Sequence, residues 1–254
     1  LPGAPTDPAA ELAAWHAHPQ RALSAWLGDL PAWLEQWRRN PQRTLDEWSA
    51  RGGHWLARAL AACRSEALAV ELPVRPLRLL GNPTALRALG GALAADPELA
   101  LRPQLAGQPC ETGCWSRHAE ACPERHASVW LRLGARLAEL AELALPGGRP
   151  LALGALALGP GEALAWSETA RGLLLHRVLL DGRGSAARIC DYQVLAPTEW
   201  NLHPQGALAR ALAALPSDPS ARRRAELLLA AFDPCLAYRL ELGAAVHGES
   251  TCHA

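Results

Sequence analysis

The first third of the chain alternates hydrophobic and polar positions with the period of a helix. Two stripes recur every three or four residues, which places the members of each stripe on one helical face. The first stripe is Trp26, Leu30, Trp33 and Trp37, and the second is Leu45, Trp48, Trp55, Leu56 and Leu60. Pro31 and Pro41 divide the region into short helices. Tryptophan stripes of this kind are typical of a core, although a docking face for a partner has the same pattern.

The middle of the chain begins at Pro73 and Pro76, which mark a boundary. The segment 76–80, with the sequence Pro-Leu-Arg-Leu-Leu, has the pattern of a short strand. A helix is expected from Asn82 to about residue 93, since Asn-Pro-Thr is a typical helix start. After a proline-rich loop, another helix is expected at about 126–145, where a Pro-Gly-Gly sequence ends it.

The second half has the shorter period of strands. An Asp-Gly-Arg-Gly sequence at 181–184 lies between two alternating segments, and this arrangement predicts a β-hairpin. No crossover helix follows this turn, so its Gly-Arg-Gly is not interpreted as a phosphate loop. The predicted strands are 151–158, 172–180 and 187–195, and the predicted helices that follow are about 206–215 and 220–232.

The order of these elements, helices followed by a small antiparallel sheet and then more helices, predicts an α+β fold that is mostly helical. The sheet is expected to pack against helices. The chain divides into a Trp-rich helical region, 1–75, and a second region, 76–254, which together form one compact domain.

Charge and composition exclude several classes of protein. The chain has 25 basic and 25 acidic residues, and every basic residue is arginine, so no net field attracts it to nucleic acid or to an anionic membrane. No apolar run approaches the ~20 residues of a membrane-spanning helix, and the first residues lack the features of a signal peptide. Seven cysteines, an odd number, fit reduced thiols or metal ligands better than a disulfide framework. We therefore expect a cytoplasmic protein without membrane insertion and without nucleic-acid binding.

Asp233-Pro234-Cys235 is the most specific local feature. Aspartate is a preferred helix N-cap and proline a preferred first helical residue, so this sequence predicts a new helix with Cys235 in its first turn. The partial positive charge at a helix N-terminus favours the thiolate, which suits a soft metal ligand or a nucleophile. A capped helix with a buried thiol has the same sequence, so both interpretations stay open.

A second group of cysteines lies in the middle of the chain. Its members are spaced four residues apart and comprise Cys110, Cys114, His118 and Cys122. Thiols and imidazole suit zinc or iron. However, a Thr-Gly pair and a proline interrupt the helix that would align them, and the spacing is not that of a zinc finger. The group is a structural zinc site, a pair of functional thiols or a set of packed cysteines.

The common catalytic signatures are missing from the sequence. There is no Gly-x-Ser-x-Gly, no Walker loop and no His-Glu-x-x-His. Glu168, Arg171 and His176 cluster around the first strand of the predicted hairpin. No nucleophile accompanies them, so a surface network is the simpler interpretation.

Three segments of the second half, taken together, resemble the carboxyl-terminal part of a NiFe-hydrogenase large subunit. They are SETARGLLLHRV at 167–178, ICDYQVLAPTEWNLHP at 189–204 and AFDPCLA at 231–237, in the same order as in those subunits. The sequence CETGCWSRH at 110–118 resembles a Glu-Thr-Gly segment farther upstream in the same proteins. The resemblance covers roughly residues 160–240 and implies a reduced large-subunit-like fold for the region 76–254.

The departures from the large subunits decide what the resemblance implies for function. Large subunits hold nickel and iron through two Cys-x-x-Cys pairs, but the only cysteine before Cys110 here is Cys63, so the first pair is missing. In the second pair Cys235 is kept, whereas Tyr238 replaces the second cysteine and Glu241 occupies a following histidine position. With three of the four ligands missing, hydrogenase activity is not expected, and the protein is not expected to be an enzyme.

The residues that are kept imply a pocket for an iron fragment. By the resemblance, Arg171 and Thr198 match residues that donate hydrogen bonds to iron-bound cyanide, and Pro197 lies in the same pocket wall. Cyanide nitrogen carries partial negative charge, which a guanidinium and a hydroxyl suit. The chain is thus similar to the HupK/HoxV group of hydrogenase assembly chaperones, and Cys-Glu-Thr-Gly-Cys-Trp at 110–115 is typical of that group.

The resemblance implies a chaperone that scaffolds Fe(CN)2CO transiently, without nickel, and transfers it to a large subunit. Because Tyr238 replaces one iron ligand, we expect Cys235 and at least one of Cys110 and Cys114 to converge on the iron, since thiolate suits low-spin iron with CO and CN. The implied partners are the large-subunit precursor, the iron–cyanide assembly proteins and a small hydrogenase-specific chaperone. Two alternatives stay open: a metal-free large-subunit mimic that docks these partners through the Trp-rich region, and a zinc-stabilised domain.

Overall fold

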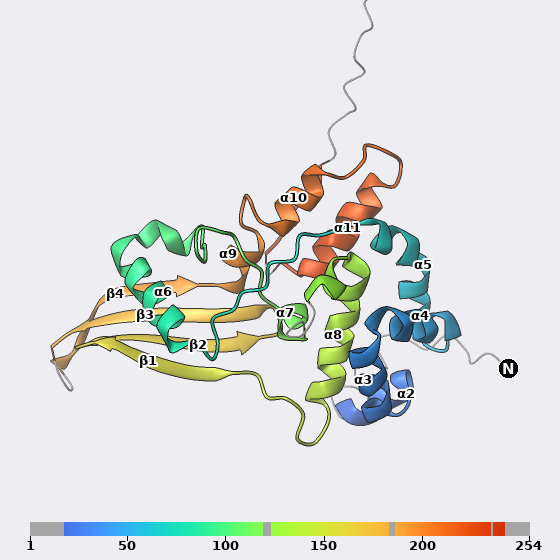
Figure 1. Ribbon diagram of the computed structural model, residues 1–254, viewed down its shortest axis with the longest axis horizontal. Helices are drawn as coiled ribbons and strands as arrows, with labels where there is room; N and C mark the ends of the chain where they lie inside the picture. The colour runs from blue at the N-terminus through green and yellow to red at the C-terminus, as the bar shows by residue number, and fades with distance from the viewer. Residues whose placement is uncertain (1–17, 119–122, 183–185, 235, 242–254) are drawn as a thin grey trace, which may run out of the picture.

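The computed structural model describes residues 18–118, 123–182, 186–234 and 236–241. These ranges contain ten α-helices, two short 3-10 helices and one four-stranded sheet, so the predicted α+β class is confirmed. In Figure 1 the helices α2 to α5 gather beside α8, while the sheet extends to the other side with α6 across it. No helix in these ranges has both the length and the apolar character needed to span a membrane.

From residue 18 onward, the described amino-terminal part contains four helices, and polar caps explain where two of them begin. They are α2 (Pro19–Leu27), α3 (Leu30–Arg39), α4 (Pro41–Arg51) and α5 (Trp55–Ala69). The Asp29 and Asn40 side chains accept hydrogen bonds from the backbone N–H groups three residues ahead, at 2.8 and 3.1 Å. Gly28 ends α2 with a φ of 84°, which favours glycine. The short helices predicted for this region are therefore confirmed.

The tryptophan stripe belongs to a core. Trp33, Trp37 and Trp48 are buried in one cluster with residues of α8 (Val129–Leu143). The packing is close at Gly134, where a Cβ would lie 2.6 Å from Trp37 Cη2. Two further helices complete this helical core, α10 (Ala207–Ala213) and α11 (Ala221–Phe232). Buried indoles do not present a docking face, so these three tryptophans contribute packing rather than partner contact.

The sheet has four antiparallel strands in the order of the chain. They are β1 (Leu153–Gly159), β2 (Glu162–Thr169), β3 (Gly172–Asp181) and β4 (Arg188–Leu195). One face packs on α6 (Pro83–Ala95), and Leu175 and Leu195 are buried there in a second core. Helix α9 (Pro197–Asn201) follows β4 and adds Trp200 to the same core. The predicted hairpin of β3 and β4 is confirmed.

The other face of the sheet carries apolar side chains in contact with solvent. Ile189 and Val194 of β4 are 65% and 41% exposed. Tyr192 stacks on His176 of β3, with the ring centroids 5.7 Å apart. The sheet is therefore packed on one face and solvated on the other within the described chain, as is common for antiparallel sheets.

Two strand predictions need correction. Residues 76–80 form no strand, and only Pro76 forms an isolated bridge, with Glu111. Proline lacks the N–H group that would extend a ladder, so the pattern of apolar residues was misleading here. The prediction also omits β2, whose sequence contains small and charged residues and no β-branched aliphatic side chain.

Asp233 ends a helix rather than beginning one, so the predicted helix start at 233–235 is wrong. It is the C-cap of α11, with a φ of 47° in the left-handed region, and residues 236–241 are not helical. Cys235 lies outside the described residues. The Asp233 carboxylate forms ion pairs with Arg136 and Arg171, and these tertiary contacts outweigh its preference for an N-cap.

Candidate functional site

A small pocket lies where the sheet, α8 and the Glu-Thr-Gly segment meet. The chain reaches it at Glu111 and continues through Thr112 and Gly113 into the short helix α7 (Cys114–His118). The opposite walls come from the turn between β2 and β3 and from the end of α11. The open space is about 20 Å³, enough for about one water molecule.

Hydrogen bonds hold the Glu-Thr-Gly segment against the start of β3. Thr112 N donates to Asn201 Oδ1 at 3.0 Å, and Leu173 N donates to Thr112 Oγ1 at 2.9 Å. Asn201 Nδ2 donates to Arg171 O at 3.3 Å. A Cβ at Gly172 would lie 2.4 Å from Thr112 Cγ2, so this close approach requires glycine. Segments far apart in the sequence are thus joined at the pocket.

Cys114 lies at the first position of α7, and its thiol is buried. Its Sγ donates a hydrogen bond to Glu139 Oε2 at 2.8 Å and lies 3.4 Å from Ala170 O. Burial, together with the negative charge of Glu139, raises the pKa of the Cys114 thiol to about 12. At neutral pH the group is therefore a protonated thiol, which must lose its proton to bind a metal as thiolate.

Glu139 is fixed in turn by a buried ion pair with Arg117. Arg117 Nε lies 2.6 Å from Glu139 Oε1, and Nη2 lies 2.8 Å from Oε2, so the pair is bidentate. Both side chains are nearly fully buried. Arg117 also donates to Thr169 O at 3.0 Å, and Glu168 Oε1 lies 3.8 Å from its guanidinium. The pair therefore orients the acceptor of the Cys114 proton and ties α7 to β2.

A second buried ion pair, between Glu111 and Arg132, lies in the wall of the same pocket. Arg132 also donates to His126 O at 3.1 Å and to Pro73 O at 2.9 Å, and its guanidinium carbon lies 4.5 Å from the centre of the Trp115 ring. Burial raises the pKa of the Glu111 carboxyl, and the charge of Arg132 opposes that shift. Buried charges need partners, so this pair holds three segments of the chain together.

Arg171 reaches the pocket from the turn between β2 and β3, and its side chain is 44% exposed. Its Nε lies 3.3 Å from Asp233 Oδ2, and Arg136 of α8 forms an ion pair with the same carboxylate. Arg136 also donates to Ala230 O at 2.9 Å. Two guanidinium groups and one carboxylate give the open side of the pocket a net positive charge.

The structure brings two of the predicted site residues together, because Cys114 and Arg171 line the same pocket. Pro197 and Thr198 lie in the first turn of α9, where they are partly buried. They do not line this pocket, whereas Asn201 at the other end of the same helix does.

The other predicted cysteines are placed differently. Cys110 is buried in the core beside the sheet, with Sγ 3.7 Å from Gln108 O, and burial raises the pKa of its thiol. It precedes α7, so the steps of four do not lie on one helix. Cys235, Cys122 and the side chain of His118 lie outside the described part of the chain. In the part that is described, no three His, Cys, Asp or Glu side chains come together as metal ligands.

Among the residues of the site that were not predicted are Arg132, Arg136, Glu139 and Asn201. Arg132 and Glu139 are seven residues apart in α8, which places both on its buried face. Charged residues within an apolar helical stripe are the signal that could have found them. Asn201 lies three residues after Thr198 in a segment that the sequence already marked for the pocket.

The known proteins that are similar to this chain include several hydrogenase expression/formation proteins. The chain is 41% identical over 258 residues to the hydrogenase expression/formation protein HoxV of Cupriavidus necator, a match that covers 95% of the chain. It is 39% identical over 155 residues to HupK of Bradyrhizobium diazoefficiens and 38% identical over 148 residues to HupV of Azotobacter chroococcum. Both are also hydrogenase expression/formation proteins, and these matches cover 57% and 56% of the chain.

The relatives are longer than the regions that match. The chain spans 62% of the length of HoxV, 42% of HupK and 40% of HupV. No family model matches the chain, and no solved structure matches it. The resemblance to the HupK/HoxV group, predicted from the motifs of the sequence, is nevertheless confirmed by these similarities.

Proposed function

We propose that this protein takes part in the maturation of a NiFe-hydrogenase, as a scaffold that holds Fe(CN)2CO and transfers it to a large-subunit precursor. The observation that carries this proposal is the convergence of Cys114 and Arg171 on one pocket. Similarity to a hydrogenase expression/formation protein over 95% of the chain supports a role in the same process. The iron unit is cargo that is bound and released.

The side chains of the pocket complement an iron atom with cyanide ligands. Cys114 supplies a sulfur once its proton has left, and thiolate is a strong ligand for low-spin iron. Arg171 supplies N–H donors that suit the partial negative charge of cyanide nitrogen. Arg136 adds a second guanidinium at the same opening. The pocket thus combines a metal ligand with donors for the diatomic ligands.

The pocket must widen to accept the cargo, because its open space of about 20 Å³ holds about one water molecule. Its adjustable side is the rim, where the exposed Arg171 is joined to Asp233 by one 3.3 Å contact. The opposite wall is tied by the hydrogen bond between Thr112 and Asn201. The cargo therefore enters and leaves at the Arg171 side.

A small number of ligands suits a scaffold that gives up its cargo. Cys114 is the only thiol of the described chain that lines the pocket, and the resemblance proposes Cys235 as a second ligand. An incomplete set of thiolates leaves the iron exchangeable, so transfer to the complete set of a large subunit is favourable. With an incomplete set of thiolate ligands, the bound iron is also lost readily in air.

The rest of the proposal follows from the resemblance to large subunits. A reduced large-subunit-like fold would surround the pocket, but Tyr238 and Glu241 stand where metal ligands would be, so the protein is proposed to lack hydrogenase activity and nickel. Its proposed partners are the large-subunit precursor, the iron–cyanide assembly proteins and a small hydrogenase-specific chaperone, in the cytoplasm.

The experiment is an infrared spectrum with metal analysis on protein purified without oxygen from cells that contain its complete maturation system. We expect CO and CN stretching bands, with iron and without nickel. The Cys114→Ala variant should lose the bands and the iron, and Arg171→Ala should shift the CN bands, because it removes donors to cyanide. Cys190→Ala is the matched control, because this thiol is exposed on β4 and does not line the pocket.

Full iron content and unchanged bands in Cys114→Ala would rule out the proposed site. Wild-type protein without iron or bands that still co-purifies with maturation proteins would favour a metal-free docking mimic. Stoichiometric zinc that resists chelators, with unfolding on its removal, would favour a zinc-stabilised domain instead.

A further inference from the structure

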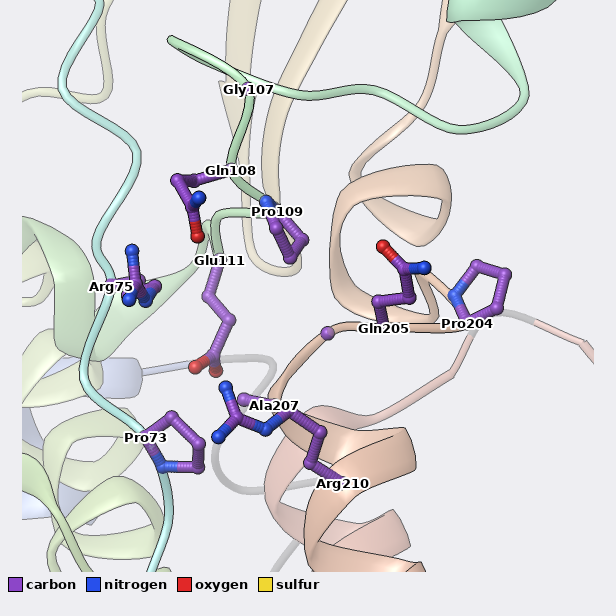
Figure 2. A pocket seen from close by; sticks show the side chains of 11 residues that line it. Pro73, Arg75, Gly107, Gln108, Pro109, Glu111, Pro204, Gln205, Ala207 and Arg210 are labelled. Carbon is purple, nitrogen blue, oxygen red and sulfur yellow. The ribbon is translucent and has the colours of Figure 1, made fainter.

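A second cavity shares Glu111 with the site described above. Its volume is about 470 Å³, within the range of small-molecule sites, roughly 300–1,000 Å³. Figure 2 shows Arg75 and Arg210 on different walls with Glu111 between them, and Gln108 and Gln205 farther out. The cavity is therefore surrounded by polar groups from three separate segments of the chain.

The two arginines of this cavity lack acidic partners. In the described chain neither the Arg75 nor the Arg210 guanidinium forms a hydrogen bond or an ion pair. The buried arginines Arg117, Arg132 and Arg177, in contrast, are all paired with carboxylates. Two uncompensated positive charges at one cavity favour an anionic ligand.

Glu111 forms the floor of the cavity, and one of its oxygens has no partner. The residue is 2% exposed, Oε2 accepts from Arg132, and Oε1 is buried without a hydrogen bond in the described chain. The nearby Trp115 indole stabilises the carboxylate charge, but no donor of the described chain has hydrogen-bond geometry to Oε1. Buried acceptors normally have a donor, so an N–H or O–H group of a ligand is the expected partner.

The backbone on both sides of the cavity is held in place. Glu111 N donates to Arg75 O at 2.8 Å, and Leu77 N donates to Glu111 O at 2.7 Å, which ties the first wall to the floor. Arg210 lies on α10, which packs into the helical core through Leu208. The backbone positions of the two arginines are therefore set before a ligand arrives, which lowers the entropic cost of binding.

We propose that this cavity binds a carboxylate with an adjacent N–H group, the arrangement at the carboxyl end of a peptide and in an N-acyl amino acid. The carboxylate lies between Arg75 and Arg210, and the N–H group donates to Glu111 Oε1. Gln108 and Gln205 bind the remaining polar atoms of the ligand. A carboxylate is favoured over a phosphate because it brings one negative charge rather than nearly two beside an acidic floor. This proposal does not depend on the iron cargo.

The test is isothermal titration calorimetry of the full chain at neutral pH with N-acetylglycine as the probe. We expect saturable binding, weakened at least about tenfold in Arg75→Ala and in Arg210→Ala, since each removes a charge-assisted contact. Both side chains are exposed, so both variants should fold. Arg21→Ala, at an exposed position on α2, is the matched control and should bind like the wild type. N-acetylglycinamide, which lacks the charge, should not bind.

A tripeptide with a free carboxyl end separates the two sources of the ligand. Tighter binding of the tripeptide supports the proposal with a protein chain end as the ligand, and tighter binding of N-acetylglycine supports it with a small molecule. No binding of either probe up to about 20 mM, equal binding of the uncharged amide, or unchanged affinity in both arginine variants would overturn it. The infrared bands of the iron cargo should persist in Arg75→Ala, so the failure of one proposal leaves the other intact.

Discussion

The Cys114 thiol donates a hydrogen bond to the Glu139 carboxylate inside the fold, with 2.8 Å between Sγ and Oε2. Arg117 holds the carboxylate from the other side. A thiol in these surroundings is a poor nucleophile and a poor metal ligand until its proton leaves. Glu139 is therefore a positioning residue, which orients the thiol without contacting the proposed cargo.

This pair makes the stability of the protein sensitive to alkaline pH. Because the pKa of Cys114 rises from its ordinary value of 9.0 to about 12 on folding, the folded protein keeps a proton that the unfolded chain releases above pH 9.0. Stability is therefore lost as the pH rises toward 12. We expect the free energy of unfolding in urea to fall more steeply between about pH 8 and about pH 10 for the wild type than for Cys114→Ala.

The exposed Cys190 provides the control for this measurement. The Cys190→Ala variant should show the wild-type dependence on pH. If the wild type, Cys114→Ala and Cys190→Ala lose stability equally over this pH range, folding does not raise the pKa of Cys114.

Residue chemistry at the site could be predicted only in part. Cys114 and Arg171 were identified because each lies in a recognisable motif. Glu139 was not, because it lies 25 residues from Cys114 and the two meet only when α7 packs on α8. The protonation state of the thiol depends on that contact and on burial, and neither is visible in a local sequence.

Elements were predicted well where local determinants set their ends. The Asn82 side chain accepts a hydrogen bond from Ala85 N at 3.0 Å and starts α6 where expected. Strands β3 and β4 pair on either side of the Asp-Gly sequence, as predicted. At Asp233, in contrast, ion pairs with residues of other elements override the local preference. Local rules therefore fail mainly where tertiary contacts of a side chain compete with them.

Two glycines in helices test how closely these elements pack. In α8, a Cβ at Gly134 would lie 2.6 Å from Trp37 Cη2 and 2.7 Å from Leu45 Cδ2. We expect Gly134→Ala to destabilise the protein by about 1–3 kcal/mol, because both neighbours are buried and cannot give way. In α6, a Cβ at Gly91 meets nothing within 4 Å, so Gly91→Ala should stabilise by about 0.5–1 kcal/mol through helix propensity.

Urea denaturation of the two glycine variants gives both values. We expect the change in the free energy of unfolding to have opposite signs in the two variants. Alanine favours the helical backbone at both positions, but only at Gly134 is there no space for the added methyl group. A Gly134→Ala protein as stable as Gly91→Ala would mean that α3, α4 and α8 pack more loosely than described.

At the scale of the molecule, the described residues form two hydrophobic cores with the site between them. Cys110 belongs to the core beside the sheet and Cys114 to the helical core, so the segment that joins them also joins the cores. Six tryptophans are buried among the residues that the structure describes, and five of them lie in the helical core: Trp33, Trp37, Trp48, Trp115 and Trp130. Tryptophan fluorescence therefore reports mainly on the half of the molecule that is remote from the sheet.

This distribution allows a test of cooperativity. Leu175→Ala removes a fully buried side chain from the core beside the sheet and should cost about 2–5 kcal/mol. We expect the urea midpoint measured by tryptophan fluorescence to fall with the midpoint measured by far-UV circular dichroism, because the linked cores unfold as one unit. Ile189→Ala, on the solvated face of the same sheet, should stay within about 0.5 kcal/mol of the wild type. A fluorescence midpoint that stays unchanged in Leu175→Ala would show that the two halves unfold independently.

The sequence by itself determined the α+β class, most of the helices, the hairpin and the similarity to the HupK/HoxV group. These depend on local periodicity, caps, turn residues and contiguous motifs, all of which act over a few residues. Only the tertiary structure decided that Cys114 shares a pocket with Arg171, that Cys110 lies in another core and that Asp233 closes α11. It also decided that Arg75 and Arg210 line one cavity, because packing brings together segments that the chain order keeps apart.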